Sequence, residues 1–158
     1  MDTILIAFIV FIVVAVIVAY LYQKKINRKT KNGIKLMLTW YDYIIAHPDN
    51  FDIVKIREIG DKVDNYIKET DIGKKVIYIT PKLREYVVSR FEKKETESID
   101  DAFERLTDWG GDTIRLEVFW TMLRGSFAEY SSQKDAGENP DFSMISAPIA
   151  MIRRYFRL

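Results

Sequence analysis

The stretch "ILIAFIVFIVVAVIVAYLY" covers residues 4–22 and contains no charged residue, no amide, no Gly and no Pro. As a helix it would be about 28 Å long, close to the ~30 Å hydrocarbon core of a bilayer. It is apolar on every face, and Tyr20 and Tyr22 stand at its end, where aromatic rings favour the headgroup level. The pattern predicts that residues 1–22 form a short N-terminal tail and a transmembrane helix.

A cleaved signal peptide is the alternative interpretation of this stretch. Such a peptide has positive charge before a shorter apolar run, and small residues at a cleavage site. Here the charged side chain before the run is the acidic Asp2, and the run ends in the bulky "AYLYQKK". We therefore expect the segment to stay attached to the rest of the chain.

Basic residues follow the span directly. They are Lys24, Lys25, Arg28, Lys29, Lys31 and Lys35, and no acidic residue appears among them before Asp42. Because Lys and Arg beside a span are retained on the cytoplasmic side, we expect a single-pass protein of the inner (plasma) membrane, with its N-terminus outside and its C-terminus in the cytoplasm. The same six residues, in a juxtamembrane stalk over residues 23–35, are candidates for contact with anionic lipids; the alternative is that they only set the topology.

Composition restricts what the remaining residues 36–158 can do. The chain has no cysteine, which excludes disulfides, cysteine-ligated zinc and a thiol nucleophile. Apart from Asp2 and the six basic residues of the stalk, 18 basic and 22 acidic side chains remain. This mildly acidic balance argues against a nucleic-acid-binding module, so we expect no nucleic-acid partner, and we expect no cofactor.

Hydrophobic periodicity predicts a mainly α domain over residues 36–158. One helical stripe precedes Pro48 and comprises Ile34, Met37, Leu38, Tyr41 and Ile45; a second comprises Ile53, Ile56, Val63 and Ile67, on a helix that Asp49 or Asn50 would cap. Further helices are predicted over residues 81–94, 99–109 and 113–133. The last of these aligns Leu116, Trp120, Leu123, Phe127 and Tyr130 on one face.

Two short stretches favour strands instead. Residues 74–80, "KKVIYIT", are rich in β-branched side chains and lie between Gly73 and Pro81. Residues 113–120, "TIRLEVFW", alternate apolar and polar positions as a strand does. If the two paired, the domain would be α+β with a short two-stranded element. Because the second stretch continues in helical register to Tyr130, we favour the mainly α interpretation.

The end of the chain is predicted as a polar loop over residues 131–143 followed by an amphipathic helix that begins near Ala147 and Pro148. Its apolar residues are Ile149, Ile152, Tyr155 and Phe156, with Arg153, Arg154 and Arg157 between them. Such a helix can lie on a membrane surface, with its arginines near lipid phosphates, or it can pack on the domain. We favour packing on the domain.

No catalytic residue is predicted. His47 is the single histidine, its "HPDN" context reads as a turn between helices, and there is no G-x-S-x-G sequence. Asp101, Glu104 and Asp108 share a predicted helix face and are candidates for a metal ion, but a solvated acidic face has the same pattern. We therefore predict no metal site.

These features together predict a membrane-anchored adaptor, assembly factor or accessory subunit that presents a cytoplasmic helical interaction domain. The expected partners are the lipid bilayer and a protein, which can be a second copy of the chain. The alternatives are a membrane-associated metal-dependent enzyme and a self-associating membrane effector. For self-association, Ala15 and Ala19 supply one pair of small residues at helical spacing.

Overall fold

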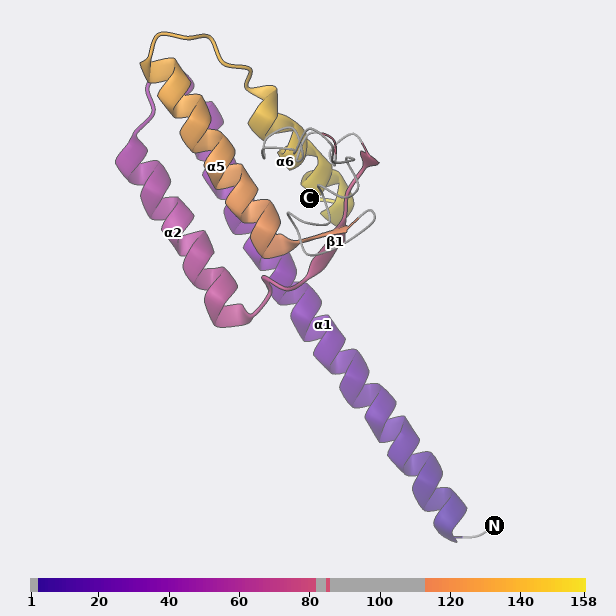
Figure 1. Ribbon diagram of the computed structural model, residues 1–158. Helices are drawn as coiled ribbons and strands as arrows, with labels where there is room; N and C mark the ends of the chain where they lie inside the picture. Colours follow the sequence, from indigo (N-terminus) through magenta and orange to yellow (C-terminus); the bar gives the residue numbers. More distant parts are fainter. Residues whose placement is uncertain (1–2, 82–84, 86–112) are drawn as a thin grey trace.

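The computed structural model describes residues 3–81, 85 and 113–158. It is mostly helical with a small two-stranded antiparallel sheet, which confirms the predicted mainly α fold class (Figure 1). The elements are α1 (Thr3–Ala46), α2 (Ile53–Thr70), β1 (Val76–Tyr78), β2 (Thr113–Arg115), α5 (Leu116–Asp135) and α6 (Ser143–Phe156). The helix predicted over residues 99–109, and nearly all of that predicted over 81–94, lie outside the described residues.

Helix α1 is unbroken, but its two halves have different surroundings (Figure 1). The N-terminal half projects away from the other elements, and its apolar side chains from Ile4 to Tyr22 are exposed. Burial begins in the second half, on a face formed by Thr30, Gly33, Ile34, Met37, Leu38, Trp40 and Ile44. Ile45 was predicted to face inward, but it is 43% exposed, because the buried face passes through Trp40 and Ile44 instead.

Helix α2 begins two or three residues later than the predicted caps would place it. The Asp52 carboxylate, rather than Asp49 or Asn50, accepts a hydrogen bond of 3.0 Å from the backbone N–H of Lys55. The buried face of α2 contains Ile56, Gly60, Val63 and Ile67. Ile53, which was also predicted to be buried, is 39% exposed because it lies one turn before this face meets the core.

Gly33 of α1 packs closely against α2 and the residues that follow it. A Cβ atom on Gly33 would collide with the Cδ1 atom of Ile72 and would lie 3.3 Å from the Cε1 atom of Tyr66. The Tyr66 hydroxyl donates a hydrogen bond of 3.1 Å to the backbone carbonyl of Lys29. The second half of α1 is therefore fixed to α2 by packing and by a hydrogen bond that reaches into the predicted stalk.

The two stretches with strand character do pair. Val76 lies opposite Arg115, Ile77 opposite Ile114 and Tyr78 opposite Thr113, in antiparallel register. The helix predicted from residue 113 therefore begins only at Leu116. Its first turn has no side-chain cap; instead the N–H of Leu116 donates to the carbonyl of Lys75 (2.8 Å) and that of Glu117 to the carbonyl of Gly73 (3.0 Å). The strand pairing thus supplies hydrogen-bond acceptors for the start of the helix.

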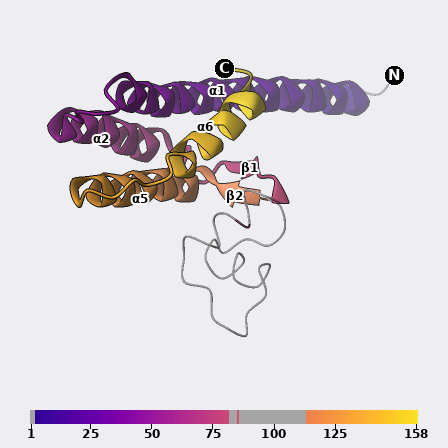
Figure 2. The ribbon, with the colours of Figure 1, turned by 90° about the horizontal axis from the view of Figure 1, so that it is seen from above.

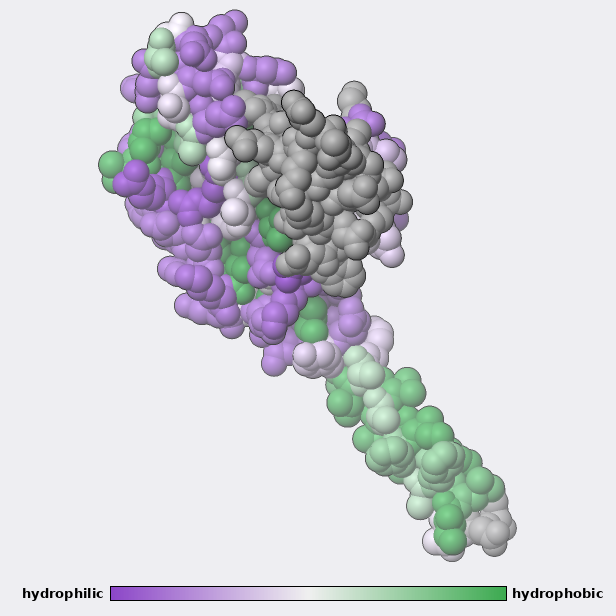
Figure 3. Space-filling model, in the orientation of Figure 1, coloured by the Kyte–Doolittle hydropathy of each residue, from purple (hydrophilic) through white to green (hydrophobic). Residues whose placement is uncertain are grey.

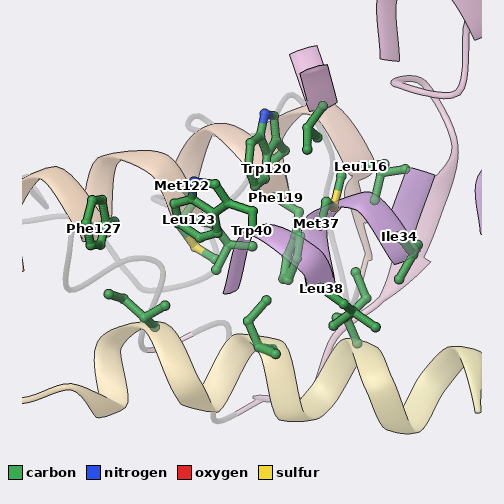
Figure 4. Close-up of a cluster of buried hydrophobic side chains, with 14 of the residues drawn as sticks. Ile34, Met37, Leu38, Trp40, Leu116, Phe119, Trp120, Met122, Leu123 and Phe127 are labelled. Carbon is green, nitrogen blue, oxygen red and sulfur yellow. The ribbon is translucent and has the colours of Figure 1, made fainter. Parts of the chain in front are cut away.

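Helix α5 provides the centre of the core. All five residues of its predicted inward face are buried, together with Phe119 and Met122. Trp40 of α1 meets Trp120 edge to face with 5.0 Å between ring centroids, and Phe127 at 5.6 Å. Figure 4 shows these side chains from α1 and α5 packed together beside α6.

Helix α6 packs on the domain, as we favour from the sequence. Ile145, Ile149 and Ile152 are buried, and the helix crosses from the side of α5 to α1 (Figure 2). It begins at Ser143, earlier than predicted, because the Asp141 carboxylate accepts hydrogen bonds from the backbone N–H and hydroxyl of Ser143 (2.9 and 2.6 Å). Helix α5 likewise extends to Asp135, so the predicted loop over residues 131–143 is shorter than expected.

Candidate membrane and partner-binding surfaces

The projecting half of α1 is the first candidate surface. Its apolar stretch is long enough to cross a membrane and no part of it is buried against the molecule. Figure 3 shows this half as a hydrophobic rod beside a largely hydrophilic domain. Among the described residues, α1 is the one helix that meets the length and composition needed for a span, although a signal sequence near an N-terminus meets them as well.

The six basic residues predicted to face lipid all lie on α1, directly after this stretch. Five are exposed, whereas Lys29 is partly buried beside Tyr66. No ion pair within the described part of the chain involves any of the six. Because α1 remains helical here, the stalk holds these charges in fixed directions instead of on a flexible tether.

The three arginines of the tail have different surroundings. Arg153 binds the Asp42 carboxylate of α1 at 2.6 Å and lies 5.8 Å from the centroid of the Tyr41 ring. Burial raises the pKa of the Tyr41 hydroxyl, and the positive charge of Arg153 opposes that rise. Arg154 and Arg157 are exposed. Arg153 thus has an intramolecular role, and the apolar face of α6 is occupied by the core.

A groove between α2 and α5 is a second candidate surface, and one that the sequence did not reveal. It is open to solvent and encloses about 680 Å³. Trp40, Ile56 and Phe127 contribute apolar lining from three helices. Along α5 the groove is lined by small side chains, namely Thr121, Gly125, Ala128, Ser131 and Ser132. Small residues leave room for the backbone of another segment to approach α5 closely.

Polar contacts between α2 and α5 close one end of the groove. The Asp64 carboxylate accepts a hydrogen bond from the Trp120 indole N–H (2.7 Å) and pairs with the Arg124 guanidinium. Arg124 also lies 3.5 Å from the Asp61 carboxylate, and it packs against Gly60, where a Cβ would be 3.2 Å from its Cζ atom. This network joins residues about sixty positions apart, so no local sequence pattern predicts it.

Lys134 ties α5 to the segment between α1 and α2. Its ammonium donates a hydrogen bond to the carbonyl of Pro48, lies 3.7 Å from the Asp49 carboxylate, and sits 5.2 Å from the centroid of the Phe51 ring.

The residues considered for chemistry offer no assembled site in the part of the chain that the structure describes. Asp101, Glu104 and Asp108 lie outside it, so their suitability for a metal ion stays untested. Within residues 3–81, 85 and 113–158, no group of three His, Asp or Glu side chains is placed to hold a metal. His47 is exposed at the end of α1, where its Nδ1 atom lies 3.2 Å from the carbonyl oxygen of Tyr43 and its ring packs on the Tyr43 ring.

Comparisons with known proteins give no further guide to the site. No protein-family model matches the chain, and neither does any curated protein or solved structure.

Proposed function

We propose that this protein is a single-pass membrane protein whose helical domain binds a protein partner on the cytoplasmic side, as an adaptor, assembly factor or accessory subunit. The observation that carries the proposal is the change of surroundings along α1, which is apolar and exposed up to Tyr22 and then forms part of the domain core from Thr30 onward. An exposed apolar surface of this length is costly in water, and a bilayer removes that cost.

The continuity of α1 favours a permanent anchor over a cleaved signal. A signal peptidase needs an accessible, extended cleavage site with small residues. Here the helix continues without a break past Tyr22, and the turns that follow carry the residues fixed to α2. Cleavage just after the apolar stretch would cut one helix that holds both the span and part of the core.

The cytoplasmic orientation rests on the basic residues, because Lys and Arg beside a span resist translocation. The interaction role rests on the groove, whose apolar lining and small residues suit a short amphipathic helix of a partner. Ile53 of α2 also lines the groove and is 39% exposed, which adds to the apolar area available to such a helix.

Membrane fractionation and a topology reporter fused after Leu158 test the anchor and its orientation. We expect the full chain to resist extraction by alkaline carbonate and the reporter to be active in the cytoplasm. A shortened chain that has lost residues 1–22, or a reporter active outside, would contradict the anchor or the orientation respectively.

Filling the groove tests the interaction role. A Cβ atom at Gly125 would meet nothing within 4 Å, and Gly125 lines the groove, so Gly125→Trp should place its ring in the groove and leave the fold intact. Selection for peptides that bind the full chain in detergent should recover amphipathic helices whose binding Gly125→Trp abolishes. The control Glu138→Trp, on the exposed loop after α5, should retain it. Equal binding by both variants would show that the partner binds elsewhere.

A further inference from the structure

Four of the basic residues after the span form a single row on α1. Lys24, Arg28, Lys31 and Lys35 are spaced four, three and four residues apart, which places them within about 60° of one another around an ideal helix. Gly33 and Trp40, which face the core, lie on roughly the opposite side. All four basic side chains are exposed. We call this set the outer basic row.

The outer basic row has a defined upper end. Asp42 continues the same line along α1, and its carboxylate is already bound to Arg153 of α6 at 2.6 Å. Between Lys24 and Lys35 the row has no acidic neighbour in the sequence. Within the described part of the chain, none of its four members forms an ion pair. The fold therefore leaves four aligned positive charges unused over about 16 Å of helix.

Anionic lipid can neutralise the lower end of the row but not the upper end. Counted along the helix from Tyr22, Lys24 is about 3 Å from the end of the apolar stretch and Lys35 is about 20 Å from it. The headgroup layer is only about 5–8 Å thick, and surface charge is screened over about 8 Å in physiological salt. In an upright helix the backbone of Lys35 therefore stands about 12–15 Å beyond the headgroup layer, which is more than one screening length.

We propose that the outer basic row binds a matching acidic row on a juxtamembrane helix of a second protein that is anchored in the same membrane. The proposal rests on the membrane anchoring proposed above. A second copy of this chain would present the same positive row and be repelled. A nucleic acid would approach a chain whose residues outside the row carry 23 acidic against 20 basic side chains.

The strength of exposed ion pairs explains why the partner must share the membrane. Four such pairs of ordinary strength change an association constant by roughly fourfold to a thousandfold in all, which is too little to recruit a dilute soluble partner. Anchoring two molecules in one membrane raises their local concentration to a level where such weak contacts decide the pairing. The row then sets which helix pairs with α1 and in what register.

The test measures energy transfer between the full chain and a synthetic partner in phosphatidylcholine vesicles. The chain contains no cysteine, so Glu138→Cys gives a single site for a dye on an exposed loop. The partner is a Leu-rich span followed by an Ala-based helix that carries four Glu residues four, three and four positions apart. Its control has the same four Glu residues distributed evenly around the helix. We expect the aligned peptide to associate about tenfold more strongly than its control.

Two variants locate the effect on the chain. Lys31→Gln together with Lys35→Gln should remove most of the preference for the aligned peptide, because the upper half of the row is lost. Lys68→Gln together with Lys74→Gln removes two exposed charges elsewhere and should leave the preference unchanged. Equal association of the two peptides, or an equal loss in both variants, would overturn the proposal.

Two further arms identify competing ligands and keep the two proposals separate. If Lys31→Gln with Lys35→Gln weakens attraction to phosphatidylserine as strongly as it weakens peptide binding, or if a short RNA displaces the aligned peptide, the acidic-helix assignment is wrong. If the chain fails to stay in the vesicles at all, it is the membrane anchor that fails. Retention in the vesicles without any preference between peptides would reject the outer basic row alone.

Discussion

The two halves of α1 are both helical, but their side chains differ: those of the first half are apolar and exposed, and those of the second half form part of the domain core. The first half has apolar side chains in every direction and buries none of them, whereas the second half buries one apolar face in the core. Side-chain identity in the first half therefore matters only as hydrophobicity, while in the second half shape and direction matter as well. Substitutions in the two halves should differ accordingly.

The largest contrast is expected for aromatic truncation. Trp40→Ala removes a side chain that is 1% exposed and packs against Trp120 and Phe127, so it should lower the free energy of unfolding by about 3–5 kcal/mol. Phe11→Ala in the first half should change it by less than about 0.5 kcal/mol. Denaturation of the full chain in detergent, followed by the fluorescence of the remaining tryptophans, measures both. Similar losses would mean that the first half also packs on the domain.

Gly33→Ala tests whether the second half of α1 tolerates a larger side chain on the face that packs against the domain. The added methyl group would collide with the terminal Cδ1 atom of Ile72, whose side chain is only 2% exposed. Crowding of this kind costs about 1–3 kcal/mol and the better helix propensity of alanine offsets about 1 kcal/mol, so we expect a net loss of up to about 2 kcal/mol. Gly125→Ala is the matched control, because its methyl group meets open space and should stabilise the domain by about 0.5–1 kcal/mol. Thermal melts of the two variants should shift in opposite directions; a shared direction would refute the close approach at Gly33.

A smaller effect is expected at the contact between the tail and α1. Arg153→Gln removes the ion pair with Asp42, which is half exposed, so the cost should be about 0.2–1 kcal/mol and should shrink in high salt. Arg154→Gln, one residue along and exposed, is the control and should have no measurable effect. If Arg154→Gln were the more damaging change, the orientation of α6 described above would be wrong.

The smallest effect is expected from one extra alanine between Gln23 and Lys24. The insertion turns the apolar half by about 100° relative to the domain. Because that half is apolar on every face, membrane retention and the stability of the domain should both remain unchanged within about 0.5 kcal/mol. The same insertion between Gly33 and Ile34 would rotate part of the core and should prevent stable folding. Sensitivity of the first site would indicate that a particular face of the span is recognised.

Much of the fold was predictable because it depends on local periodicity. The buried face of α5 and the strand at Val76–Tyr78 follow from spacing and β-branching alone. The start of α5 was not, because the pairing of β2 with β1 moves the first helical residue from position 113 to Leu116, and that pairing joins distant segments. The early start of α6 accompanies a hydrogen bond from the Ser143 N–H to the Asp141 carboxylate. The sequence instead favours a start near Pro148, because proline is common in the first turn of a helix.

The candidate surfaces also divide into one that local sequence predicts and one that depends on contacts between distant segments. The apolar stretch and the basic residues that follow it are continuous in the sequence, so they could be found there. The groove requires Trp40, Ile56 and Phe127 to meet, and the polar contact beside it joins Asp64 to Arg124. Nothing in the spacing of these residues indicates the contacts, because each one joins different helices.

Because α1 is unbroken, it also fixes the distance between the apolar stretch and the groove. Trp40 follows Tyr22 by eighteen residues, or five helical turns, so the lining of the groove stands about 27 Å above the hydrocarbon when the helix is upright. A partner anchored in the same bilayer must span that height before it can enter the groove, which takes at least about eight residues of extended chain. A membrane protein whose docking segment follows its span by a shorter tether could not reach the groove. The choice of partner would therefore depend on tether length as well as on surface chemistry.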